Sequence, residues 1–198
     1  MVPVLQRYFV LELNQAAMSV GVIVGVTGLF ALPLGGWIAD RLHLRLPNGR
    51  LLFGGISLLI TSLCTGIALL GGKIDVVIFV GLFAVGWVFA YKFYTCVYTA
   101  VQDVVEPRLR ATAMALFFAG LYLLGGGLGP VIVGGLSDHF AEQAMLAAGA
   151  LEMTEAFRAI GLHSAMYLVP AAMGLTGLFL LVAISTYKDD ARKMTQEA

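Results

Sequence analysis

A lysine stands near the middle of a long apolar run, where a membrane-inserted ammonium group is costly. Lys92 lies in the segment WVFAYKFYTCVYTAVQD, and mid-bilayer burial of a Lys side chain costs roughly 2.5–3.5 kcal/mol on insertion scales. At about 100° per residue, its helix face also carries Cys96, Thr99 and Asp103, with Thr95 beside it. A polar stripe at this depth is expected to face protein or a water-filled cavity.

Two interpretations of this stripe stay open. In the first, Lys92, Tyr91, Thr95 and Thr99 form a binding site for a small-molecule substrate, with Lys92 holding an anionic head group. A second, aromatic face would then line an apolar part of the cavity; it carries Trp87, Tyr91, Tyr94 and Tyr98. In the second interpretation, Lys92 snorkels to the membrane surface or pairs with a structural carboxylate, and the aromatic rings pack or anchor at the interface.

The segment GGWIADRL places a glycine, a carboxylate and a guanidinium at the end of another apolar run. Gly36 is expected to permit close helix approach, and Asp40 to cap or face the positive N-terminus of a neighbouring helix. Such a contact contributes roughly 0.3–1 kcal/mol when exposed and up to about 2 kcal/mol when partly buried, which could bias a two-state gate. The alternative is a charged loop, with Asp40 and Arg41, that only sets topology.

A third segment, EPRLRATAMA followed by GLYLLGGGLGPVIVGGLSD, combines arginines with many glycines and a proline. Arg110 leads into this helix, and Gly129 precedes Pro130 within it. Pro130 cannot donate to the carbonyl of Gly126, so the hydrogen-bond ladder has a weak point there. We expect the glycines to pack closely against neighbouring helices, and bending at this point to serve as a conformational element of a gate.

Other chemistries have no motif in this sequence. The spans contain no HExxH, no paired intramembrane aspartates and no histidine box, so we expect neither an enzyme nor a metal or cofactor. Cys64 and Cys96 both lie in apolar runs and suggest buried thiols. The formal net charge is zero, which gives no indication of nucleic-acid binding.

The elements that must position these residues are membrane helices. The chain is 60% hydrophobic and only 12% charged, against about 25% charged residues in ordinary soluble domains. A bilayer crossing takes about 20 mainly apolar residues. Five segments qualify, and the runs are too long and too uniformly apolar for membrane strands. The predicted spans are Ala16–Ile38, Leu51–Leu70, Val76–Ala100, Ala111–Leu136 and Ser164–Thr186.

Basic residues predict the orientation of these spans. Alternation places eight on one side, namely Arg41, Arg45, Arg50, Arg108, Arg110, Lys188, Arg192 and Lys193, and three on the other, namely Arg7, Lys73 and Arg158. The positive-inside rule makes the first side cytoplasmic. We therefore expect a multi-pass protein of the plasma or inner membrane, with residues 187–198 as a cytoplasmic tail. Residues 1–13 are expected to be the end of a helix whose beginning lies further upstream.

Two of these segments resemble the major facilitator superfamily of transporters. The run from Gly36 to Leu42, GWIADRL, is similar to its cytoplasmic-loop signature, with Arg45 or Arg50 in the later basic position. The run from Pro107 to Asp138 is similar to its penultimate helix. The amino-acid sequences of both segments most resemble the spinster-like branch of the superfamily. The resemblance implies an all-α bundle forming the C-terminal half of a twelve-helix transporter, with the five spans as helices eight to twelve.

That resemblance also implies a function. Two halves would rock around a midplane site and move an organic, amphipathic or lipid-like solute by alternating access. The partner helix of Asp40 would then belong to a missing N-terminal half, and this chain alone would not transport. The competing reading is a half-size or fragmentary membrane protein that serves as a scaffold or assembles with a second copy of itself.

Overall fold

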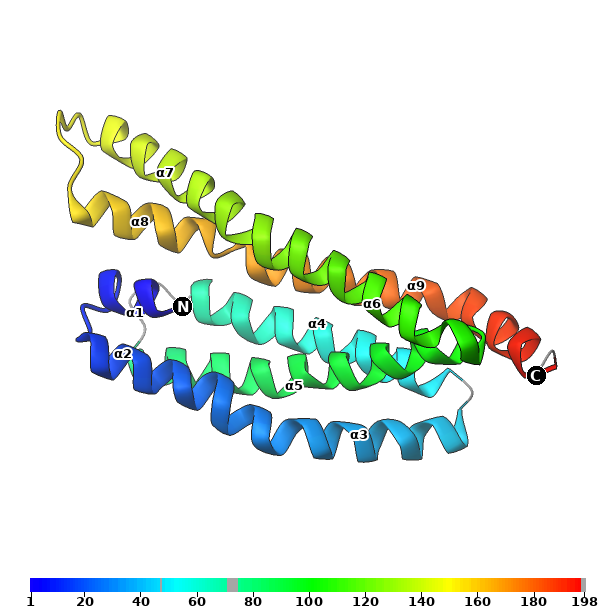
Figure 1. Cartoon of the computed structure of the whole chain (residues 1–198). Coiled ribbons are helices and arrows are strands. Elements are labelled where there is room, and N and C mark those ends of the chain that lie inside the picture. The colour runs from blue at the N-terminus through cyan, green and yellow to red at the C-terminus, as the bar shows by residue number, and fades with distance from the viewer. Residues whose placement is uncertain (47, 71–74, 197–198) are drawn as a thin grey trace.

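The structure, a computed structural model, describes residues 1–46, 48–70 and 75–196, and every regular element in these ranges is a helix. Five helical segments are long and apolar enough to cross a membrane: Leu13–Leu42, Gly49–Leu70, Val76–Asp103, Pro107–Ala147 and Glu155–Tyr187. The five predicted spans and the all-α fold class are thereby confirmed. The helices run roughly along one long axis of the molecule (Figure 1).

The first spanning segment is built from three successive pieces. A short helix, α1 (Val2–Arg7), precedes α2 (Leu13–Val20), the π-helical segment η1 (Gly21–Val26) and α3 (Thr27–Arg45). Val10, between α1 and α2, takes the left-handed conformation with φ of 56°. The segment therefore begins at Leu13 and ends at Arg45, longer at both ends than the predicted span.

Helix α4 (Gly49–Leu70) lies between α5 (Val76–Asp103) and α9 (Leu168–Gln196), as Figure 1 shows. Small residues bring α4 and α9 close together: a Cβ added at Gly55 would lie 2.8 Å from Leu181 Cδ2 and 3.1 Å from the Gly177 carbonyl oxygen. Hydroxyl groups add polar contacts, since Thr61 Oγ1 donates to the Gly86 carbonyl at 3.0 Å and Ser62 Oγ to the Pro170 carbonyl at 2.7 Å. This use of small and hydroxylated residues is typical of helix packing in lipid.

The fourth segment runs well past its predicted end at Leu136. It comprises η2 (Pro107–Leu109), α6 (Arg110–Gly120), the π-helical segment η3 (Leu121–Leu128) and α7 (Gly129–Ala147). Helix α8 (Glu155–Ala165) returns beside α7 and leads into α9 (Figure 1). Gly161 makes the hairpin tight, because a Cβ there would overlap the Ser137 carbonyl and lie 2.7 Å from the Ala141 nitrogen.

Ion pairs lie at both ends of the bundle. Arg50 contacts Asp103 at one end, and Arg7 lies 3.7 Å from Glu155 at the other. This agrees with the two groups of basic residues inferred from the sequence, of which Lys73 lies outside the described residues. The cytoplasmic assignment of either end stays a prediction.

Candidate functional site

A cavity of about 630 Å³ opens between α3, α5 and η3. Helix α5 supplies four aromatic side chains at intervals of four, three and four residues, so that they share one face. The lining consists of Leu32 from α3, Trp87, Tyr91, Tyr94 and Tyr98 from α5, and Leu121, Tyr122, Gly125 and Gly126 from η3. We call this the tyrosine cavity, and its α5 wall is the aromatic face that helical spacing predicted.

Tyr91 ties this wall to the π-helical segment of the first span. Its hydroxyl donates to the Val24 carbonyl oxygen at 2.7 Å, and Val24 belongs to η1. The Tyr91 ring lies against Gly28, where an added Cβ would be 3.0 Å from the ring. Side chains that satisfy backbone groups at irregular helical turns are a common solution inside membranes, where water is absent.

The other phenol groups of the cavity are free to meet a solute. Within the described part of the chain, the hydroxyls of Tyr94, Tyr98 and Tyr122 make no hydrogen bond to protein atoms. The ring of Tyr98 meets Phe117 and Phe118 edge-on, with centroids 5.7 and 5.2 Å apart, so α6 closes on this side of the wall. The cavity therefore offers apolar ring faces together with unpaired hydroxyl groups.

A smaller cavity of about 230 Å³ lies beside the first and shares Trp87, Tyr94 and Leu121 with it. Its remaining lining comes from α4, α5 and α9, namely Leu58, Ala90, Phe93, Ala172, Met173 and Thr176. The Thr176 hydroxyl donates to the Ala172 carbonyl at 2.8 Å, so its polar group is already satisfied within α9. The wall that this second cavity presents is apolar.

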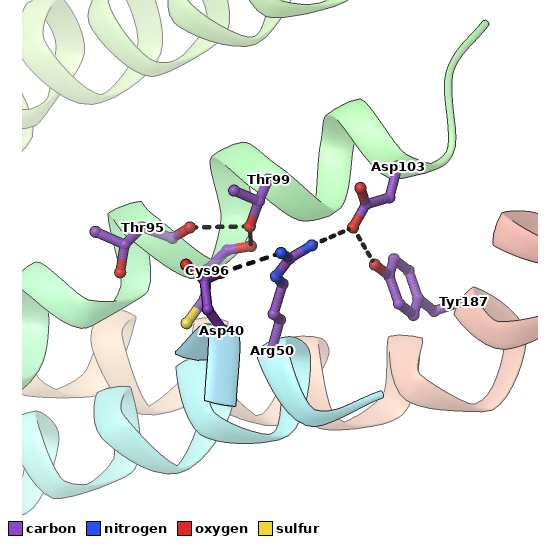
Figure 2. Close-up of polar contacts among 7 residues, drawn as sticks. All are labelled: Asp40, Arg50, Thr95, Cys96, Thr99, Asp103 and Tyr187. Atoms are coloured by element: carbon purple, nitrogen blue, oxygen red, sulfur yellow. Dashed lines mark hydrogen bonds and ion pairs between the residues drawn. The ribbon is translucent and has the colours of Figure 1, made fainter. Parts of the chain in front are cut away.

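An ion-pair network joins four helices at the end of the bundle where α3 ends and α4 begins (Figure 2). Arg50 donates to Asp103 Oδ2 at 2.9 Å and to Asp40 Oδ1 at 3.1 Å, and Tyr187 donates to the same Asp103 oxygen at 2.8 Å. Asp40 thus contacts the first turn of a helix within this chain, whereas the family resemblance implied a partner helix on the missing half, and it does so through an arginine side chain rather than backbone N–H groups. Arg50 makes both ion pairs, and Arg45 makes none within the described residues.

Comparison with known proteins identifies the family. Residues 1–130, about two thirds of the chain, match the sequence profile of the Major Facilitator Superfamily. The chain belongs to the major facilitator superfamily. It is 28% identical to Protein spinster homolog 3 of Danio rerio, a match that covers 87% of this chain and 33% of the relative.

Further relatives lie in the same superfamily. The chain is 26% identical to a probable sphingolipid transporter, spinster homolog 3 of Arabidopsis thaliana, over 67% of its own length and 25% of the relative. It is 29% identical to an MFS-type efflux pump of Mycolicibacterium smegmatis, over 91% of its length and 38% of the pump. The chain therefore spans between a quarter and two fifths of these relatives, and the spinster-like resemblance is confirmed.

A solved structure supports the fold. The inward-facing, unoccupied crystal structure of a bacterial homolog of the human lysosomal transporter Spinster matches with a TM-score of 0.66 at 23% identity. The match covers 98% of this chain and 43% of that one. The helices described here therefore adopt part of a major facilitator fold.

Against this major facilitator framework, only one of the four predicted substrate residues lines the tyrosine cavity. Tyr91 does, whereas Lys92 lies toward α3 and α4, with its nitrogen 4.2 Å from the Phe89 ring centroid and 5.5 Å from that of Phe53. A Cβ at Gly35 would lie 3.0 Å from Lys92 Cγ. Lys92 and Tyr91 therefore lie on different faces of α5, because adjacent residues on a helix point about 100° apart.

The hydroxyls of the two predicted threonines bond within their own helix. Thr95 Oγ1 donates to the Lys92 carbonyl at 2.9 Å, and Thr99 Oγ1 to the Thr95 carbonyl at 3.0 Å, the second of these visible in Figure 2. Their hydroxyls satisfy carbonyls of their own helix, a frequent behaviour of Thr in membrane helices. Neither lines the tyrosine cavity.

The predicted gate residues are also placed differently from expectation. A Cβ at Gly36 or at Gly129 would meet no atom of the described chain within 4 Å, so neither glycine mediates close packing here; Gly35 does so instead. Pro130 is the second residue of α7, two positions beyond the end of η3, the π-helical segment that contains Gly126. Arg41 stacks on Trp37, and Arg110 Nε donates to the Val105 carbonyl at 3.4 Å.

Proposed function

We propose that this chain forms half of the solute pathway of a major facilitator transporter that moves a small, amphipathic organic solute by alternating access. The observation that carries the proposal is the tyrosine cavity. Its volume of about 630 Å³ falls within the range of small-molecule sites, and its rings and free hydroxyls suit a solute with both apolar and polar parts. The adjoining apolar cavity would hold a further apolar part of the same solute.

The substrate class takes support from two sides. A relative of this chain is described as a probable sphingolipid transporter, and aromatic walls bind hydrocarbon well. We place the polar end of the solute among the hydroxyls of Tyr94, Tyr98 and Tyr122. In this proposal Lys92 does not contact the solute.

The pathway requires a second wall. We propose that an N-terminal half, or a second copy of this chain, covers the tyrosine cavity, and that the multi-pass bundle lies in the plasma or inner membrane with its C-terminus in the cytoplasm. Such a protein rocks two bundles about a midplane site. The chain alone then shows no saturable uptake when it is reconstituted into liposomes, and saturable uptake would contradict the proposal.

Trp87 offers a direct test of the cavity, because it is one of only two tryptophans. In a Trp37→Phe background, sphingosine titrated into nanodiscs containing the chain is expected to change Trp87 fluorescence in a saturable way. Tyr94→Ala and Tyr98→Ala should each weaken binding roughly tenfold, since an aromatic contact contributes about 0.5–1.5 kcal/mol beyond its buried area. Phe179→Ala, which removes an exposed ring from α9, serves as the matched control.

The competing function, a scaffold that assembles without transport, gives a different result. A scaffold has no need of a solute site, so sphingosine would cause no saturable signal, and Tyr94→Ala would behave as Phe179→Ala does.

A further inference from the structure

Three residues at the end of α3 follow one another at intervals of four. Trp37, Arg41 and Arg45 therefore lie on one face of the helix, and all three side chains are exposed. The guanidinium carbon of Arg41 lies 4.1 Å from the centroid of the Trp37 ring. This cation–π contact keeps the guanidinium against the exposed ring. We call these three residues the Trp–Arg face.

No carboxylate among the described side chains pairs with this face. The neighbouring carboxylate, Asp40, points about 100° away around the helix and bonds to Arg50 at 3.1 Å. Among the side chains that the structure describes, no carboxylate lies within 4 Å of Arg41 or Arg45. The guanidinium groups of Arg41 and Arg45, about one helical turn apart in sequence, thus have no anionic partner within the described part of the chain.

The same helix face changes character along its length. One and two turns before Trp37 lie Leu34 and Phe30, which are 56% and 62% exposed. Packing against α5 uses the other side of the helix, at Gly28 and Gly35. From Phe30 to Arg45 the face passes from apolar to aromatic to cationic over about 22 Å, at a rise of 1.5 Å per residue.

This order matches one leaflet of a membrane. Acyl chains are apolar, tryptophan prefers the level of the glycerol and carbonyl groups, and arginine pairs with phosphate through its planar fork. A free anion would contact only the arginines and would leave the apolar half of the face exposed. We propose that the Trp–Arg face binds an anionic phospholipid, with its phosphate on Arg41 and Arg45, its glycerol region at Trp37 and its acyl chains along Leu34 and Phe30.

The experiment uses Trp37 as the reporter in the full chain carrying Trp87→Phe. Nanodiscs of phosphatidylcholine receive increasing fractions of brominated phosphatidylglycerol or of brominated phosphatidylcholine, since bromine quenches tryptophan only at short range. We expect phosphatidylglycerol to quench Trp37 at a mole fraction at least about fivefold lower, from the attraction of one or two basic groups to an anionic headgroup.

Matched variants separate a site from general surface charge. Arg41→Gln should abolish most of the preference for phosphatidylglycerol over phosphatidylcholine, and Arg41→Lys, which keeps the charge but loses the planar fork, should retain part of it. Arg108→Gln removes an equal charge at the same end of the bundle, from an arginine that is 81% exposed and paired with Glu106. This control should leave the preference unchanged. Circular dichroism and gel filtration establish that each variant is folded.

Three results would overturn the proposal. The first is equal quenching by both brominated lipids. The second is an equal loss of preference in Arg41→Gln and Arg108→Gln, which reduces the effect to the net charge of the surface. The third is protection of Trp37 from both lipids, which means that a protein segment covers the face instead.

Discussion

Arg50 contacts two carboxylates, and they differ in how well they are shielded from water. Its own side chain is 17% exposed, that of Asp103 is 33% exposed and that of Asp40 is 66% exposed. Water screens an exposed pair strongly, so the contact with Asp103 contributes more than the contact with Asp40. Tyr187 strengthens the same contact by donating to the shared oxygen of Asp103.

Replacing Arg50 by glutamine is expected to destabilise the chain by roughly 2 kcal/mol, because two hydrogen bonds to charged groups are lost and Asp103 keeps only Tyr187. Thermal unfolding in detergent micelles measures the effect. Arg108→Gln, which breaks an exposed pair with Glu106, should cost less than about 1 kcal/mol. Equal losses of stability in the two variants would mean that the network stabilises the chain no more than an exposed ion pair does.

Removing the hydroxyl of Tyr91 should loosen the first span locally. Tyr91→Phe leaves the Val24 carbonyl without its side-chain donor, at a cost of about 1 kcal/mol. We expect faster hydrogen exchange in η1, measured by mass spectrometry, and no change there in Tyr94→Phe, whose hydroxyl makes no protein contact among the described residues. Unchanged exchange in Tyr91→Phe would show that η1 does not depend on this bond.

Lys92→Met tests whether this lysine contributes to solute binding. Methionine keeps the aliphatic packing beside Gly35 and removes the charge that lies between Phe53 and Phe89. Affinity for sphingosine in the Trp87 fluorescence assay is expected to stay within about twofold of the unsubstituted chain, since a residue remote from the solute couples weakly to it. A tenfold loss would return Lys92 to the solute site.

At the scale of whole elements, the α7–α8 hairpin depends on one glycine. Gly161→Ala forces a methyl group against the Ser137 carbonyl and the Ala141 backbone, so the two helices must move apart. We expect a destabilisation of about 1–3 kcal/mol, as for other overpacked contacts, measured by thermal unfolding. Gly135→Ala on the same α7 has no neighbour within 4 Å among the described residues and should change little.

Sequence reasoning found the elements better than it found their ends or their partners. Hydropathy alone predicted the five spans, because lipid demands about 20 apolar residues whatever they pack against. It did not predict that α7 continues unbroken to Ala147, since the apolar run ends at Leu136 and the polar stretch after it was expected to hold only short helical pieces outside the lipid. The polarity of the residues alone does not distinguish a loop from a helix that continues out of the membrane.

The candidate site was only partly predictable for a related reason. The aromatic face of α5 follows from spacing within one helix, and Tyr94 and Tyr98 were found in this way. The pairing of Arg50 with Asp103 joins residues that are 53 positions apart, and no local pattern specifies it. Lys92 and Tyr91 were assigned to different faces of the helix but to one predicted site, because helical spacing does not show which face meets a cavity.

For the molecule as a whole, the segment from Pro107 to Ala147 is unusual because the most apolar part of it has no buried residue. Several of its glycines meet nothing within 4 Å in the described chain, among them Gly129 and Gly134. Exposed small residues on a membrane helix are typical of a surface that a further helix approaches closely. This is the surface we assign to the second half or second copy.

Bulky side chains on that surface should block assembly and leave the chain itself intact. Gly129→Leu and Gly134→Leu are expected to keep the thermal unfolding temperature within about 2 °C, since an exposed substitution changes stability by less than about 0.5 kcal/mol. In native mass spectrometry, the same variants should no longer form the complex with the second half or second copy. Gly81→Leu, at an equally open position on α5, is the control that should assemble normally.

The π-helical segments η1 and η3 lie in two of the helices that enclose the tyrosine cavity. Each closes its hydrogen-bonded rings over five residues instead of four. Conversion of one such segment to α-helical winding would displace a single residue, turn everything beyond it by about 100° and shift it by about 1.5 Å. Side chains beyond the segment would then turn from the cavity toward the lipid, or from the lipid toward the cavity. The backbone hydrogen bonds would re-form in the new register, so that no backbone group would be exposed unpaired to hydrocarbon.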